Sequence, residues 1–172
     1  MPQIASTSRL IIRTWDESDI NALCRLTQEQ GIGDFAISSY RNFSVEKARE
    51  WVAREQQRFD KRGLARFAIE LAETKEIIGI SGIFEMLPPD EDKVELNYRY
   101  PTRQRGQGYA TEAAKAILAY GFRTLMLSSI DAVTEPENES SKRVLSRLGF
   151  HKIADLQYEC RPWEQWRISA EY

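Results

Sequence analysis

Residues 93–122 constrain the fold more than any other segment, because a strand, a glycine-containing loop and a helix follow one another without a break. Apolar and polar residues alternate over residues 93–100, which is typical of a strand. Over residues 113–122, apolar residues recur at helical spacing. The loop between them reads Arg-Gln-Arg-Gly-Gln-Gly-Tyr-Ala-Thr over residues 103–111. The segment therefore predicts a strand–loop–helix unit.

The loop has the features of a phosphate-binding site. Gly106 and Gly108 carry no side chain, so successive backbone N–H groups can turn toward one ligand. The helix that follows presents the positive end of its dipole, and Arg103 and Arg105 add charge. Together these features favour a pyrophosphate site over the simpler interpretation, a glycine turn with solvated arginines. A dinucleotide-binding fingerprint needs a third glycine where Thr111 stands, so a nicotinamide cofactor is the weaker interpretation.

The rest of the chain predicts further strands and helices. We expect strands over residues 9–14, 67–71, 77–84, 129–134, 150–156 and 163–171. We expect helices that begin after Asp16 or Ser18, at Ser44, and at Asn138 or Ser140, the last of which ends at Gly149. The middle strands follow one another as a meander, and the later strands alternate with helices. At 172 residues, this order predicts one α/β domain over residues 1–172.

The composition excludes several classes of protein. The 24 Lys and Arg residues and 26 Asp and Glu residues give a net charge of −2, which disfavours nucleic-acid binding by a basic surface. One histidine, His151, and two cysteines, Cys24 and Cys160, cannot supply a four-ligand zinc site. No run of about 18 apolar residues is present, and residues 1–8 lack the features of a signal peptide. We therefore expect a cytoplasmic protein without nucleic-acid, membrane or metal partners.

Two segments resemble a known family. The pattern R-x-x-G-x-G-x-A over residues 103–110, after the strand that contains residues 94–98, resembles motif A of the GNAT superfamily of acyl-CoA-dependent N-acetyltransferases. Residues 138–141, followed by Val-Leu at 144–145 and Leu-Gly-Phe at 148–150, resemble its second conserved block. The sequence is most similar to the branch of the Rim ribosomal-protein N-terminal acetyltransferases. The resemblance implies a mixed, mostly antiparallel central sheet with helices on both faces.

The resemblance also implies acetyl-CoA as co-substrate and a set of residues that bind it. The backbone of residues 98–100 would pair with the pantetheine arm as an added strand, where this strand and the next splay apart. The implied cofactor-binding residues are Tyr98, Arg99, Tyr100, Arg103, Gln104, Arg105, Gly106, Gln107, Gly108, Tyr109, Ala110, Thr111, Asn138 and Ser141. Lys142 or Arg143 either contacts a phosphate of CoA or is a solvated charge on the helix surface.

Acetyl transfer to an amine needs a base, because a protonated amine is no nucleophile. Glu95 is the candidate, since it lies in the middle of the strand beside the expected cofactor groove, with Asn97 and Arg99 on the same face. A purely structural pairing, with Arg99 or with a neighbouring strand, is the competing interpretation. A free backbone N–H near Tyr98 or Arg99 could stabilise the oxyanion that forms on the thioester.

The general acid is less clear from the sequence. Many family members have a tyrosine four residues before the Gly-Phe pair, and this chain has Leu145 there. Ser141 is the nearest substitute, and Tyr98 and Tyr109 are alternatives. A thiol pKa near ~8.5 also allows the thiolate to leave without an acid.

The sequence therefore predicts an N-acetyltransferase that joins acetyl-CoA and a primary amine in a ternary complex. The amine is either a protein N-terminus or a small molecule. The alternative is a non-catalytic acyl-CoA-binding or regulatory protein on the same fold, which only Leu145 supports. By family position, Phe35, Tyr40 and Arg41 could line the acceptor pocket. Exposed strand edges near the C-terminus would allow a homodimer, and His151 is expected to be structural.

Overall fold

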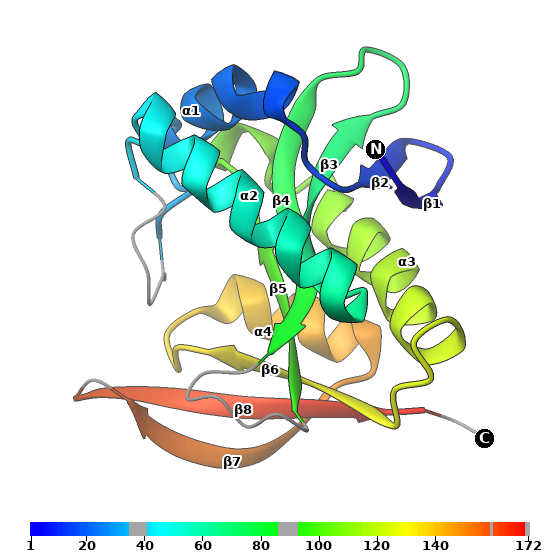
Figure 1. The fold of residues 1–172 in the computed structure, drawn as a ribbon. Helices are drawn as coiled ribbons and strands as arrows, with labels where there is room; N and C mark the ends of the chain where they lie inside the picture. Colours follow the sequence, from blue (N-terminus) through cyan, green and yellow to red (C-terminus); the bar gives the residue numbers. More distant parts are fainter. Residues whose placement is uncertain (35–40, 86–92, 159, 171–172) are drawn as a thin grey trace.

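In the part of the chain that the structure describes, eight strands form one sheet in the order β1-β2-β3-β4-β5-β6-β8-β7 (Figure 1). The computed structural model describes residues 1–34, 41–85, 93–158 and 160–170. The strands are β1 (Gln3–Ser6), β2 (Leu10–Arg13), β3 (Ala65–Leu71), β4 (Ile77–Glu85), β5 (Val94–Arg99), β6 (Ser129–Thr134), β7 (His151–Tyr158) and β8 (Arg161–Ser169). Strands β5 and β6 run parallel, whereas all other neighbours are antiparallel.

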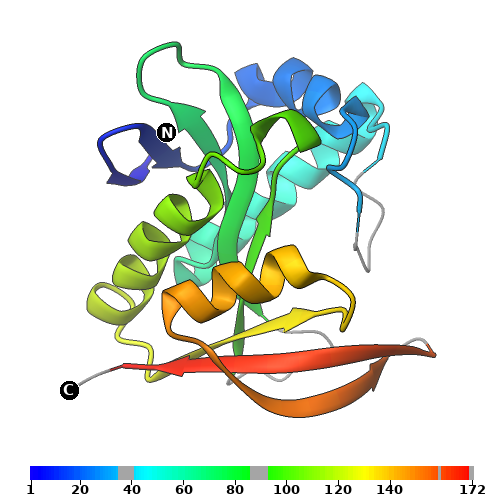
Figure 2. The same ribbon diagram turned by 180° about the vertical axis from the view of Figure 1, so that it is seen from behind.

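Helices cover both faces of this sheet (Figures 1 and 2). One face carries α1 (Ile20–Gln28) and α2 (Val45–Arg62), and the other carries α3 (Tyr109–Arg123) and α4 (Glu139–Leu148). Two short 3-10 helices, Glu17–Asp19 and Thr102–Gln104, precede α1 and α3. The expected α/β architecture, a mostly antiparallel sheet between helices, is confirmed.

Each layer of helices has its own apolar core. Between α3, α4 and the sheet, side chains such as Phe67, Ile83 and Ile117 are fully buried. On the α1–α2 side, Trp15 and Trp51 pack edge to face with ring centroids 5.5 Å apart. Burial of these apolar surfaces on both sides fixes the position of the strands between them.

Helices α2 and α4 start at capping residues read from the sequence, whereas the expected cap Asp16 begins the 3-10 helix Glu17–Asp19 and α1 follows it from Ile20. The side chain of Ser44 accepts a hydrogen bond from Lys47 N at the start of α2, and Asn138 accepts from Ser141 N at the start of α4. Helix α3 begins at Tyr109, directly after Gly108. Strand β1 was not expected, because Gln-Ile-Ala-Ser is short and pairs only at the edge with β2.

Strand β5 has the two faces that the alternation predicts, and the first residue of its polar face is buried. Helices cover both sides of the sheet here, so Glu95 on the polar face is only 8% exposed. In the described part of the chain, no group of three or more His, Cys, Asp or Glu could hold a metal ion. None of the helices within these residues has the length and apolar character needed to cross a membrane.

Candidate active site

Strands β5 and β6 separate shortly after they meet. Along the two strands, both of which are fully described, Glu95 opposite Asp131 is the single residue pair in register. Beyond this pair, residues 96–98 of β5 are in register with no residue of β6, so the sheet opens between the two strands toward their carboxyl ends. A parallel sheet commonly binds ligands at such an opening.

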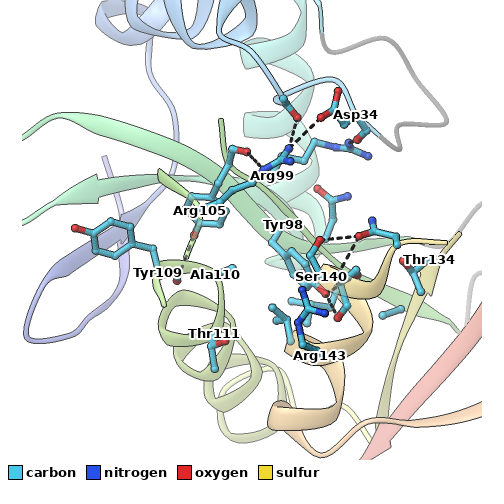
Figure 3. A pocket seen from close by; sticks show the side chains of 18 of the residues that line it. Asp34, Tyr98, Arg99, Arg105, Tyr109, Ala110, Thr111, Thr134, Ser140 and Arg143 are labelled. Carbon is cyan, nitrogen blue, oxygen red and sulfur yellow. Dashed lines mark hydrogen bonds and ion pairs between the residues drawn. The ribbon is translucent and has the colours of Figure 1, made fainter. Parts of the chain in front are cut away.

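A cavity of about 320 Å³ occupies this opening. Strand β5, the glycine loop, the end of β6 and helix α4 form its walls (Figure 3). Among the residues predicted from the sequence, those that line it are Tyr98, Arg99, Tyr100, Gln104, Arg105, Gly106, Gly108, Tyr109, Ala110, Thr111, Asn138 and Ser141. The fold thus brings together two segments that lie about 30 residues apart in the sequence.

Three of the predicted residues do not line the cavity: Glu95, Arg103 and Gln107. Arg103 turns to the surface, where its guanidinium forms ion pairs with Glu29 and Glu76. Gln107 Nε2 donates to the carbonyl oxygen of Arg103 at 3.2 Å. Glu29 follows α1 and Glu76 lies in the turn between β3 and β4. The sequence around Arg103 therefore gives no sign that these two carboxylates are its partners.

The glycine loop has the backbone conformation that a side chain disfavours. Gly106 and Gly108 have φ of +79° and +83°, and Gly108 is the N-cap of α3. In the described chain, a Cβ at Gly106 would meet no atom within 4 Å, and a Cβ at Gly108 would meet only Arg9 Nη2, at 3.5 Å. The amide groups at the start of α3 therefore border open space in the cavity, which is the geometry of an anion site.

Arg105 holds one wall of the cavity in place. Its Nε donates to the carbonyl oxygen of Tyr100 at 3.1 Å, and its Nη2 donates to the carbonyl oxygen of Gly31 at 2.6 Å. Arg99 Nη1 donates to the carbonyl oxygen of Asp34 at 3.2 Å. These bonds join the end of β5 to the turn after α1, so Gly31 and Asp34 also line the cavity.

Buried polar atoms in the wall lack partners. Asn97 Oδ1, Thr134 Oγ1 and Trp163 Nε1 are each buried without a hydrogen bond in the described structure, and all three residues line the cavity. A buried polar atom that lacks a hydrogen bond costs free energy. A ligand with amide groups, such as the pantetheine arm of CoA, offers both donors and acceptors to such atoms. The wall therefore fits a polar, extended ligand.

Glu95 lies behind this wall. Its burial raises the pKa of the carboxyl group from 4.5 to about 7, against the opposing charges of Arg66 and Arg99. Asp131, opposite it, raises the pKa further. Asp131 itself is held by Arg167 Nε at 2.6 Å and by Gln165 Nε2 at 2.7 Å.

Helix α4 contributes a hydroxyl and two cations. Tyr98 Oη lies 2.8 Å from Ser141 Oγ, while Leu145 is fully buried in the core. Burial raises the pKa of the Tyr98 hydroxyl well above its ordinary value, and the hydrogen bond with Ser141 partly offsets this. Arg143 and Arg147 line the cavity one helical turn apart.

Lys142 and Arg143 have different surroundings, although the sequence did not separate them. Lys142 Nζ forms an ion pair with Glu139 at 2.5 Å and does not line the cavity, whereas Arg143 does. Of the expected acceptor-side residues, Phe35 and Tyr40 lie outside the described residues. Arg41 is exposed, forms an ion pair with Asp34 at 3.8 Å and does not line the cavity.

Sequence reasoning missed several wall residues: Asn97, Thr134, Glu135, Arg147 and Trp163. A signal exists for Thr134 and Glu135, because Thr134 ends the strand parallel to β5, Glu135 follows it directly, and ligands bind at the carboxyl ends of such strands. Trp163 has no such signal. It reaches the cavity only because β8 pairs with β6 in one particular register.

Comparisons with known proteins agree with this geometry. A family model described as an acetyltransferase (GNAT) domain matches residues 9–151. The chain is 32% identical over 150 residues to the uncharacterized N-acetyltransferase p20 of Bacillus licheniformis, covering 85% of this chain and 81% of that protein. It is 32% identical over 165 residues to the uncharacterized N-acetyltransferase YoaA of Bacillus subtilis, covering 90% of this chain and 86% of that protein.

The fold is also similar to that of RimL, a ribosomal alpha-N-protein acetyltransferase solved in complex with coenzyme A. The TM-score is 0.82 at 18% identity, with 98% of each chain covered. The chain therefore belongs to the GNAT acetyltransferase family. It is an acyltransferase of the class that uses acetyl-CoA.

Proposed function

We propose that this protein transfers the acetyl group of acetyl-CoA to a primary amine, by direct attack of the amine in a ternary complex. The observation that carries the proposal is the opening between β5 and β6, which leads to the glycine loop at the start of α3. This one cavity offers the edge of β5 beyond its pairing with β6, a glycine loop suited to an anion, and buried polar atoms that lack hydrogen bonds within the described residues.

The cavity residues support the binding of CoA. The amides that follow Gly106 and Gly108 would hold the pyrophosphate, and Thr111 could add a hydroxyl. The strand edge at residues 98–100, which faces the cavity, would pair with the pantetheine arm as an added strand pairs with a sheet edge. Arg143 and Arg147, which line the cavity, supply positive charge for a further phosphate. Asn138 stands near the inner end, beside Ser141.

Two carboxylates could accept the proton of the amine. Glu95 acts through a bridging water, because its carboxyl group does not line the cavity and its neighbour Asn97 does. A pKa near 7 suits a base that works around neutral pH. Glu135 lines the cavity directly, but forms an ion pair with Arg161. We assign the base to Glu95 and the electrostatic attraction of the ammonium group to Glu135.

The amine class that this site accepts is a protein N-terminus or a small-molecule amine.

The proposal is tested first by thermal unfolding with acetyl-CoA, with NAD as the control ligand. At about 100 times Kd, a specific ligand adds about 2.7 kcal/mol of stability, which corresponds to a rise of roughly 5–10 °C in Tm. A rise with NAD alone would contradict the proposal.

A panel of amines and N-terminal peptides then follows, with thiol release as the readout. Release of CoA that depends on the amine is expected. If acetyl-CoA binds but no amine in the panel causes release of CoA, the result favours the alternative function, a non-catalytic acyl-CoA-binding protein. That alternative is suggested by Leu145 in place of a tyrosine.

A further inference from the structure

Two hydroxyl groups in the cavity wall, one from β5 and one from α4, form a hydrogen-bonded pair. Tyr98 Oη lies 2.8 Å from Ser141 Oγ and 3.3 Å from the carbonyl oxygen of Ser141. Ser141 is held from its other side, because its backbone N–H donates to Asn138 Oδ1 at 3.1 Å. Both members of the pair line the cavity, and position 145 offers only a buried apolar side chain. The pair thus places two hydroxyl groups in the cavity, one of them on the helix that carries Leu145 in place of the family's usual tyrosine.

The two hydroxyl groups can be hydrogen-bonded in a definite order, with Tyr98 as the donor and Ser141 as the acceptor. A serine hydroxyl has one proton and two lone pairs, and a tyrosine hydroxyl also has one proton to give. When the Tyr98 proton points at Ser141 Oγ, the Ser141 proton is free to point into the cavity. Within the described residues, Tyr98 is the single side chain bonded to Ser141 Oγ. An acceptor in the cavity would therefore select this arrangement.

Burial keeps Tyr98 a donor. It raises the pKa of the Tyr98 hydroxyl far above neutral pH, so the phenol keeps its proton during turnover. Chained hydrogen bonds polarise one another, and a hydroxyl that accepts a bond becomes a stronger donor. Tyr98 therefore strengthens the bond that Ser141 can donate.

We propose that Tyr98 is a positioning residue that turns the Ser141 hydroxyl toward the sulfur of CoA, so that the two replace the missing tyrosine at position 145. This inference rests on the proposed function. As the amine nitrogen bonds to the acetyl carbon and the carbon–sulfur bond breaks, the electron pair stays on sulfur. Ser141 then donates a hydrogen bond to the thiolate while Tyr98 donates to Ser141. No proton is lost from either side chain, and the thiolate later takes its proton from water.

The test measures the pKa of the CoA thiol while CoA is bound to the full chain. Ultraviolet absorbance of the thiolate is titrated in the complex with CoA, and the complex with desulfo-CoA is the blank. Cys24 and Cys160 are present in both samples and cancel. The other charged groups of the cavity are unchanged in every variant: Asp34, Arg99, Arg105, Glu135, Arg143 and Arg147.

We expect the bound thiol of the wild type to titrate below the thiol of free CoA measured in the same buffer, because a hydrogen bond to the thiolate favours the charged form. Ser141→Ala should raise that thiol pKa by about one unit, and Tyr98→Phe should raise it by a smaller amount. The double variant should match Ser141→Ala, because Tyr98 acts only through the serine hydroxyl. Ser141→Thr keeps a hydroxyl and should stay close to the wild type.

Each other result has a definite meaning. An unchanged thiol pKa in Tyr98→Phe, beside a raised one in Ser141→Ala, removes Tyr98 from the mechanism. A double variant that exceeds Ser141→Ala shows that Tyr98 acts independently, which also overturns the inference. Ser141→Thr behaving as Ser141→Ala excludes the hydroxyl. A wild type that binds no CoA in calorimetry defeats the proposed function itself, which separates the two failures.

Discussion

Glu95 and Asp131 lie opposite each other where β5 and β6 separate, and both carboxyl groups are buried. Asp131 is compensated by Arg167 and Gln165, whereas burial leaves Glu95 with a pKa raised from 4.5 to about 7. The start of the cofactor opening is therefore a point where the protein binds a proton near neutral pH.

Glu95 makes the stability of the fold depend on pH. Between about pH 4.5 and 7 the folded protein keeps a proton that the unfolded chain has released, so the contribution of Glu95 to the free energy of unfolding falls as pH rises through this window. Glu95→Gln should remove this dependence and exceed the wild type above pH 7, by up to about 3 kcal/mol. Urea unfolding at several pH values measures the free energy of unfolding of both proteins. If the two free energies change with pH in parallel, the prediction is contradicted.

Gly108 is expected to be required for CoA binding rather than for folding. Gly108→Ala places a side chain at positive φ beside the anion site and should weaken CoA binding about tenfold or more. Gly149→Ala is the matched control, because Gly149 also has positive φ, at +90°, but ends α4 outside the cavity. Both variants should lose about 1 kcal/mol of stability. Equal CoA affinity in calorimetry for the two variants would refute the anion site.

The parts of the site that follow from local sequence could be predicted. The strand–loop–helix unit at residues 93–122 depends on alternation, two glycines and helical spacing, all within one short segment. The cap at Asn138 is likewise local. These features place the loop and α4, and with them most of the cavity.

The remaining parts depend on contacts between distant segments. Trp163 enters the wall through the pairing of β8 with β6, and Gly31 through the bond from Arg105. The burial of Glu95 comes from layers on both faces of the sheet. The alternation in β5 predicted a polar face, but it could not show that this face is covered.

Arg103 and Arg105 should behave differently, although the sequence assigns both to the pyrophosphate. Arg103→Ala removes half-exposed ion pairs with Glu29 and Glu76, so it should cost about 1 kcal/mol or less and leave CoA affinity unchanged. Arg105→Ala loses its bonds to Tyr100 and Gly31 in the cavity wall and should weaken CoA binding about tenfold. Calorimetric titration compares them. Similar losses of affinity would mean that Arg103 turns inward when CoA binds.

The positive charge of α4 should contribute to CoA affinity. Arg143→Ala and Arg147→Ala are each expected to weaken binding several-fold, and less so at high salt, because the bond is to a phosphate. Lys142→Ala is the control on the same helix, since Lys142 is paired with Glu139 outside the cavity. An equal loss in the Lys142 variant would point to a general field of the helix rather than a defined contact.

The two candidate carboxylates should separate in the pH profile of kcat/KM for the amine. If Glu95 is the base, activity falls below about pH 7 as Glu95 takes up its proton. Glu95→Gln should then lower kcat by about 100-fold and remove the acidic limb of the profile, which is the fall in activity below about pH 7. Glu135→Gln should keep the limb and raise KM, because it removes only charge from the cavity wall. If the limb instead vanishes in Glu135→Gln and persists in Glu95→Gln, Glu135 is the base and the role of Glu95 is confined to the fold.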